Sequence, residues 1–334
     1  MGQKDITLKV NYARKQFPAL KNDFVFMDNA GGSQTLRPVM NRITQYLTNY
    51  DVQLGASYEV SRNAGKVLQD AHRSIAQLIN AKRKEEVVIG PSSTMLFRIL
   101  SLCISKQWKK GDEVIVSNSD HEANVSCWTD LKKQGIKIKV WKVNSKTLEF
   151  DIKDLQKLLT KKTRLVTLVH TSNVLGTINP IKEIAKVVHK AGALICVDGV
   201  AYAPHRLVDV RKMDVDFYVF SWYKVYGPHQ AVLYGKYDEL KKLDSINHYF
   251  IGKEVIPYKL QPGNFNYELT YSLQGISEYL TDLHDQHFPK DKEQSNRKKL
   301  QKSFDLIAEH EERLAEPLIQ FLKEHPAVRI IGKV

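Results

Sequence analysis

The amino-acid sequence predicts an α/β fold in which a mostly parallel sheet is flanked by helices, and two observations lead to this class. From residue 24 to residue 198, short apolar runs rich in β-branched residues alternate with longer amphipathic stretches, as in repeated strand and helix units. The chain has 334 residues, of which 43% are hydrophobic and 26% charged, so it can bury a large core.

Seven segments have the composition of buried strands, and the amphipathic stretches between them indicate helices over 64–80 and 180–190. The second helix begins with a proline, which first helical positions favour. The predicted strands are 86–89, 113–117, 136–143, 165–170, 194–197, 217–220 and 231–234.

After about residue 268 the strand patterns stop, and two long helical patterns follow at 269–283 and 295–323. A polar, lysine-rich connection separates them. Residues 327–331 have the composition of one more strand, and an unpaired strand at the end of a chain is unfavourable.

These patterns predict three parts of the chain: an N-terminal segment (1–22), a large α/β domain (23–285), and the start of a second, smaller C-terminal domain (286–334). Because the strand predicted at 327–331 has no partner after it, we expect this second domain to be incomplete.

The composition argues against several classes of protein. The formal charge is +13, but the lysines lie in scattered pairs, which is typical of a solvated surface, so nucleic acid is not expected as a partner. No apolar segment approaches the roughly 18 to 20 residues of a membrane-spanning helix.

The three cysteines, Cys103, Cys127 and Cys196, show no metal-ligand spacing, which favours a reducing compartment and predicts no metal site. Residues 1–11 lack the apolar run of a signal peptide, so we expect a cytoplasmic protein, with an organelle as the alternative.

Two charged residues follow predicted strands, at the edge of an α/β sheet where ligands bind. Asp198 ends one strand, and a buried carboxylate is costly unless it meets a cation such as a protonated ring nitrogen. Lys224 follows the next strand, and burial lowers the pKa of a lysine amine, as Schiff-base chemistry requires. A capping aspartate and a surface lysine are the alternatives.

Polar residues follow three other predicted strands. The loop that contains Ser93 and Thr94 precedes a helical pattern near residue 95 and suits a phosphate, although it also fits an ordinary helix cap. His121 could stack on a flat ring, and Asn173 could donate a hydrogen bond to a phenolic oxygen or shape a turn. No P-loop or GxGxxG motif follows a strand, which argues against nucleotide binding.

In this combination, together with the motifs Asp28-Asn29-Ala30-Gly31-Gly32 and Tyr202-Ala203-Pro204-His205, the chain resembles the class V aminotransferase and cysteine desulfurase family. This family belongs to the fold-type I enzymes that use pyridoxal 5'-phosphate (PLP). The resemblance covers about residues 24–283 and implies the fold-type I PLP-dependent transferase fold.

The resemblance implies a role for each candidate residue. The catalytic group would be Lys224, which holds PLP as a Schiff base, Asp198, which pairs with the ring nitrogen, and His121, which stacks on the ring. The remaining cofactor-binding residues would be Asn173 at the ring hydroxyl, Ser93, Thr94, Ser221 and Tyr223 at the phosphate, and Asn264 at the phosphate of the neighbouring subunit. The resemblance thus also implies a homodimer.

Three positions depart from the family pattern. Ala201 stands where many relatives have Gln or His, Tyr223 where many have His, and Asn264 where many have Thr. In desulfurases, the sulfur-accepting cysteine and the arginine that binds the substrate carboxylate lie in the C-terminal domain, beyond the position of Val334. Cys103, Cys127 and Cys196 fit core positions better than a sulfur carrier.

The resemblance therefore implies an enzyme whose small-molecule substrate is an amino acid, with C–S bond cleavage of the cysteine desulfurase type as the first hypothesis. An aminotransferase, β-lyase or epimerase of the same family is the alternative. A PLP-binding scaffold without turnover is a third hypothesis.

Overall fold

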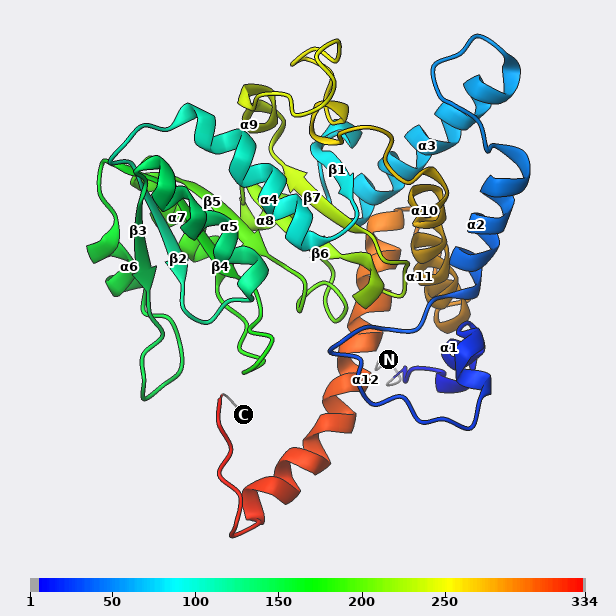
Figure 1. The fold of residues 1–334 in the computed structure, drawn as a ribbon. Coiled ribbons are helices and arrows are strands. Elements are labelled where there is room, and N and C mark those ends of the chain that lie inside the picture. Colours follow the sequence, from blue (N-terminus) through cyan, green and yellow to red (C-terminus); the bar gives the residue numbers. More distant parts are fainter. Residues whose placement is uncertain (1–5, 333–334) are drawn as a thin grey trace.

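The computed structural model describes residues 6–332, so residues 1–5 and 333–334 of the expected terminal segments lie outside the described residues. A seven-stranded sheet forms the centre, with strand order β1-β7-β6-β5-β4-β2-β3 (Figure 1). The strands are β1 (Val87–Gly90), β2 (Glu113–Ser117), β3 (Lys137–Trp141), β4 (Thr163–Val169), β5 (Leu194–Asp198), β6 (Phe217–Ser221) and β7 (Ala231–Gly235).

The sheet confirms the predicted mostly parallel α/β fold. Strand β7 runs antiparallel to both of its neighbours, and all other neighbouring strands are parallel. All seven predicted strands are present, and each boundary lies within two residues of its predicted position.

Helices cover both faces of the sheet. Along β6, Phe217 and Val219 pack toward α4 and α5, whereas Tyr218 and Phe220 pack toward α3, α7 and α11, as the alternation of a strand requires. The helices are α1 (Val10–Lys15), α2 (Arg37–Asn49), α3 (Glu59–Leu78), α4 (Ser93–Ile104), α5 (Ser126–Thr129), α6 (Ile152–Leu158), α7 (Ile181–Lys190), α8 (Val210–Met213), α9 (Tyr237–Lys242), α10 (Tyr267–Ser272), α11 (Gln274–His287) and α12 (Asn296–Glu324).

Three sequence predictions were wrong in detail. The helix predicted over 269–283 is two helices, α10 and α11, which meet at Leu273. Pro180 precedes α7 as its N-cap residue and does not occupy its first turn. Residues 327–331 form no strand and are largely exposed.

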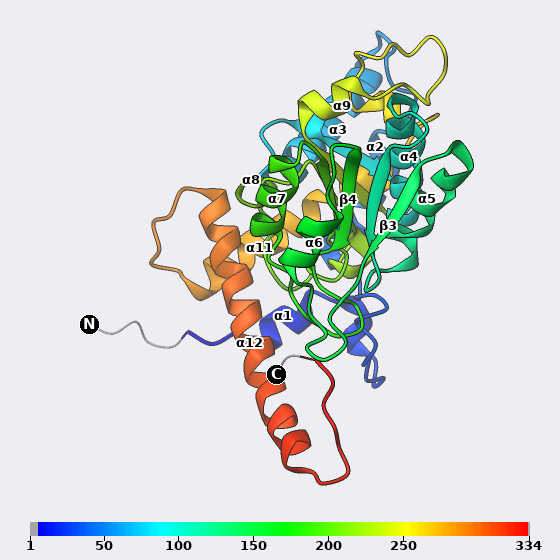
Figure 2. The same ribbon diagram turned by 90° about the vertical axis from the view of Figure 1, so that its left-hand side faces the viewer.

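Helix α12 extends from the body of the protein, as Figures 1 and 2 show. Its first half packs against the core through Leu300, Phe304 and Ile307. Its second half, which carries Leu314 and Phe321, is exposed. The first half therefore fixes the position of α12 beside the sheet.

A fully buried lysine attaches the segment after α9 to the core. The Lys259 side chain has no exposed surface, and its Nζ donates to the carbonyl oxygens of Leu243 at 2.6 Å and Lys241 at 3.2 Å. Burial lowers the pKa of Lys259, so the two carbonyl contacts offset part of the cost of burying this amine.

Replacing Lys259 with methionine is expected to lower the free energy of unfolding by about 2 to 4 kcal/mol, because one buried and one partly buried carbonyl group lose their donor. Urea denaturation followed by circular dichroism measures this change. Lys241→Met is the matched control, since the Lys241 side chain is exposed and its carbonyl group is retained. A K259M chain within about 0.5 kcal/mol of the unaltered chain would contradict this role.

Candidate active site

Asp198 is the last residue of β5 and lies buried at the carboxyl edge of the sheet. Its Oδ1 accepts a hydrogen bond from the Val200 N–H at 2.9 Å. Burial raises the pKa of Asp198 to about 6, against the opposing effects of that hydrogen bond and of His121 and Lys224. Within residues 6–332 this carboxylate forms no ion pair, and a buried carboxylate of this kind favours a cationic partner.

Lys224 ends a short 3₁₀ helix, Trp222–Lys224, that directly follows β6. Its side chain is half-buried, and burial lowers the pKa of the amine while Asp198 and Asp28 oppose that shift. This confirms the lowered pKa predicted from sequence. An amine that loses its proton more readily is a better nucleophile toward an aldehyde.

Lys224 lines a cavity of about 330 Å³ at the carboxyl edge of the sheet. Asn173 lines the same cavity, although its side chain is largely exposed. The neighbouring Thr171 hydroxyl is buried and has no hydrogen-bond partner among the described residues. Other lining residues are Asn29, Ala201, Tyr202, Arg206 and Glu311.

The N-terminus of α4 provides the anion-binding end of the site. Helix α4 begins at Ser93, two residues earlier than the sequence indicates, and Ser92 caps it by accepting from the Met95 N–H at 3.1 Å. Ser93 and Thr94 are thus the first two helical residues, whose N–H groups have no acceptor within the helix. Such amides attract phosphate groups.

Ser221 lies at the same edge, one strand away from α4. The sheet register pairs Gly90, just before the α4 cap, with Ala231, and pairs Ala231 with Ser221. The Ser221 side chain is completely buried, yet its hydroxyl has no hydrogen-bond partner within the part of the chain that the structure describes. A buried hydroxyl in this state favours an acceptor from a bound molecule.

His121 follows β2 and caps the short 3₁₀ helix Glu122–Asn124. Its Nδ1 accepts from the Ala123 N–H at 3.1 Å, so the neutral ring carries its proton on Nε2. Its side chain is exposed at the sheet edge, close enough to Asp198 to lower that residue's pKa.

Sequence reasoning missed Asp120, which precedes His121. Its carboxylate accepts from the His121 N–H and the Asn124 side chain, both at 2.9 Å, and from the Ser117 hydroxyl at 3.2 Å. Burial and then the charge of Asp198 raise the pKa of Asp120 well above its usual range. The signal in the sequence is an acidic residue three positions after the end of a buried strand.

Two of the positions that depart from the family pattern, Tyr223 and Ala201, lie at or beside stacked aromatic rings. The Tyr223 ring stacks on His229 with the ring centres 5.2 Å apart. Ala201 contributes no polar group, and the adjacent Tyr202 stacks on His170 at 3.6 Å. The His170 Nδ1 in turn lies 2.8 Å from the Tyr218 hydroxyl.

Asn264 does not line the cavity at Lys224. It is exposed and donates to the Gln53 side chain at 3.0 Å.

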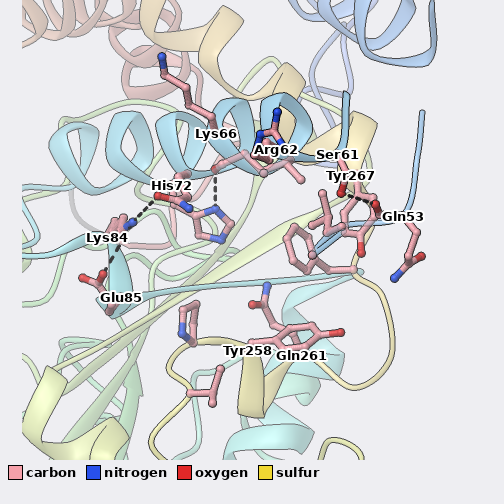
Figure 3. A pocket seen from close by; sticks show the side chains of 18 of the residues that line it. Gln53, Ser61, Arg62, Lys66, His72, Lys84, Glu85, Tyr258, Gln261 and Tyr267 are labelled. Carbon is pink, nitrogen blue, oxygen red and sulfur yellow. Dashed lines mark hydrogen bonds and ion pairs between the residues drawn. The ribbon is translucent and has the colours of Figure 1, made fainter. Parts of the chain in front are cut away.

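Gln53 borders a separate cavity of about 920 Å³ between α3 and the segment 255–267 (Figure 3). In that larger cavity the His72 ring points inward, whereas Lys66 points away. Lys224 lines the smaller cavity and not the larger one, whereas Asp198 lines neither. The predicted chemistry of the Lys224 amine therefore points to the smaller cavity.

Two features are absent from residues 6–332. No group of three or more His, Cys, Asp or Glu side chains is arranged to hold a metal ion in this range. None of its helices has the length and hydropathy needed to cross a membrane.

The donor set fits PLP. The α4 N-terminus and the unpartnered Ser221 hydroxyl suit its phosphate, the Asp198 carboxylate suits its ring nitrogen, and the Lys224 amine suits its aldehyde. Fold and site together define a PLP-dependent enzyme.

Comparison with known proteins identifies the family. The family model described as Aminotransferase class-V matches residues 25–311. An aminotransferase-like protein of Gibberella zeae is 41% identical, over 98% of this chain and 78% of that protein. A cysteine desulfurase-like protein of Aspergillus flavus is 34% identical, over 98% of this chain and 72% of that protein. This chain belongs to the class V aminotransferase family.

Solved structures agree with this assignment. The cysteine desulfurase CsdA of Escherichia coli has a TM-score of 0.71 and 26% identity, and the match covers 84% of this chain and 77% of that one. A cysteine desulfurase of Thermococcus onnurineus has a TM-score of 0.81 over 96% of this chain and 78% of that one. At 22% identity, the second structure supports the fold alone.

Proposed function

We propose that this PLP-dependent enzyme is cysteine desulfurase-like and cleaves the C–S bond of a small amino acid. The observation that carries the proposal is that Lys224 lines a cavity at the carboxyl edge of the sheet and lies within electrostatic range of the buried Asp198 carboxylate. Desulfurases among the relatives and solved structures favour C–S cleavage over other reactions of the family.

In this proposal the site residues share the binding of PLP. Lys224 holds PLP through a Schiff base, Asp198 keeps the ring nitrogen protonated, and His121 covers one face of the ring. Asn173 donates to the ring hydroxyl. The phosphate is held by Ser93, Thr94, Ser221 and Tyr223, with Asn264 from a neighbouring subunit.

Bound PLP supplies an electron sink that makes the Cα proton of an amino acid acidic. The Lys224 amine would be the base that takes that proton on Nζ and could return it elsewhere on the substrate. The lowered pKa of Lys224 favours this, because a larger fraction of the amine is unprotonated near neutral pH.

Transamination is the second candidate, and the aminotransferase-like relative at 41% identity favours it. Incubation with cysteine, a reducing thiol and an α-keto acid as amino acceptor separates the two reactions by their products. C–S cleavage gives alanine and sulfide in equal amounts. Transamination gives the keto acid of cysteine, which retains its sulfur, and the amino acid formed from the acceptor. PLP binding without any product would support the scaffold hypothesis.

We also propose a homodimer. Asn264 lies outside the cavity of its own chain, which supports a role for it at the phosphate of a second copy. Light scattering that gives the mass of one chain would contradict the homodimer.

The division into a large domain (23–285) and a smaller C-terminal domain (286–334) is a further proposal, supported by the loop between α11 and α12. A cytoplasmic location is proposed because the three cysteines are free thiols. Limited proteolysis within that loop and microscopy of a fluorescent fusion test these two proposals.

The decisive test of the site is to reduce the protein with borohydride in the presence of PLP and to map the labelled peptide. We expect a protein that is yellow with PLP before reduction, loses this colour on reduction, and then carries the pyridoxyl group on Lys224. A label on another lysine, or no label, would overturn the assignment.

A further inference from the structure

The segment 28–36 runs along the turn that carries Lys224, although about 190 residues separate the two in sequence. The Ser33 N–H donates to the Tyr223 carbonyl at 2.9 Å, and the Leu36 N–H donates to the Tyr226 carbonyl at 3.1 Å. These backbone bonds connect the segment to the turn on both sides of Lys224.

The Ser33 hydroxyl forms a second connection within this contact. It donates to the Tyr223 carbonyl at 3.0 Å and accepts from the Tyr226 N–H at 2.8 Å. One oxygen atom thus bridges the residue just before Lys224 and the residue two positions after it. The hydroxyl sets the distance between the two ends of the turn.

The turn itself has few internal restraints. The N–H groups of Val225 and Gly227 both donate to one carbonyl, that of Trp222. Tyr226 has φ of +63°, a left-handed conformation that costs a residue other than glycine roughly 1 kcal/mol or more. A conformation of this kind persists only where its surroundings hold it, and Ser33 accepts the N–H of this very residue.

We propose that Ser33 is a positioning residue for Lys224, whose hydroxyl bridge between Tyr223 and Tyr226 keeps the amine directed into the cavity. The inference rests on the proposed role of Lys224 as the cofactor lysine. Without the bridge, Lys224 spends part of its time in other orientations, so that PLP is captured more slowly and released more readily.

Three variants test the proposal. Ser33→Ala removes the bridge, and Ser33→Thr keeps a hydroxyl at the same position. The matched control is Thr35→Val, since the Thr35 hydroxyl in the same segment lies 3.5 Å from the Gly227 carbonyl, at the outer limit of a hydrogen bond. Circular dichroism checks that each variant is folded.

Two readouts follow the turn itself. The first is hydrogen exchange of the cofactor-free protein in peptides that cover 222–230. The second is the rate of covalent PLP capture at Lys224, measured by borohydride trapping and mass spectrometry. For S33A we expect faster exchange and roughly three- to tenfold slower capture, which corresponds to the loss of one net hydrogen bond. S33T and T35V are expected to stay within about twofold of the unaltered chain.

The outcomes separate this inference from the proposed function. If S33A exchanges and captures PLP like the unaltered chain, with the label on Lys224, the positioning role is overturned and the cofactor role stands. If S33T is as impaired as S33A, the bridge is not the cause. If the unaltered chain carries no label on Lys224, both are overturned.

Discussion

Replacing Lys224 with alanine is expected to abolish covalent retention of PLP and to lower turnover by about three orders of magnitude. The same amine would hold the cofactor and move the Cα proton, so its loss removes both tasks. Lys224→Arg keeps a cation near Asp198 but cannot form a Schiff base, and it is expected to lose retention as well. Borohydride trapping and product formation from cysteine measure the two effects.

The control for this prediction is Lys241→Ala, which removes an exposed lysine far from the cavity. It should retain both labelling and turnover. A K224A protein that still carried a borohydride-stable label would contradict the central assignment.

Replacing Asp198 with asparagine is expected to change activity and stability in opposite directions. Turnover should fall by roughly two to three orders of magnitude, because a neutral amide cannot keep the ring nitrogen protonated. The cofactor-free protein should become more stable at pH 8 by roughly 1 to 3 kcal/mol, because a buried carboxylate without an ion-pair partner is removed.

The pH dependence has a definite sign. Burial raises the pKa of Asp198 to about 6, so the folded chain binds this proton more tightly than the unfolded chain. The carboxyl group therefore destabilises the cofactor-free fold progressively as pH rises from about 4 to about 6, and by a constant amount above that. The stability gain of D198N should disappear near pH 4. Urea denaturation at pH 4 and pH 8 tests this, and an equal gain at both values would contradict it.

Local patterns predicted most of this fold. The strands were found because buried parallel strands are short, continuous apolar runs. Asp198 and Lys224 stand out as charged residues, the first at the end of one strand and the second three residues after another. The break between α10 and α11 at Leu273 was missed because leucine is a good helix former, and only packing decides that the chain turns there.

The site was harder to complete from sequence. Asp120 acts on Asp198 through space, and Ser33 contacts Tyr223 and Tyr226 from a distant part of the chain. Contacts between residues this far apart leave no periodic pattern in the sequence. The sequence also does not indicate where the cavities lie. Lys224 lines the cavity of about 330 Å³ and not the larger one of about 920 Å³.

The three buried cysteines have a practical consequence. Cys103, Cys127 and Cys196 lie in the core, as expected, and burial raises the pKa of Cys103 to about 11 and that of Cys127 to about 12. Thiol reagents attack the ionised sulfur, so the folded chain should resist alkylation. The rate at which iodoacetamide alkylates these cysteines would then measure how often the core opens. The three thiols can therefore be used to follow local unfolding without an added label.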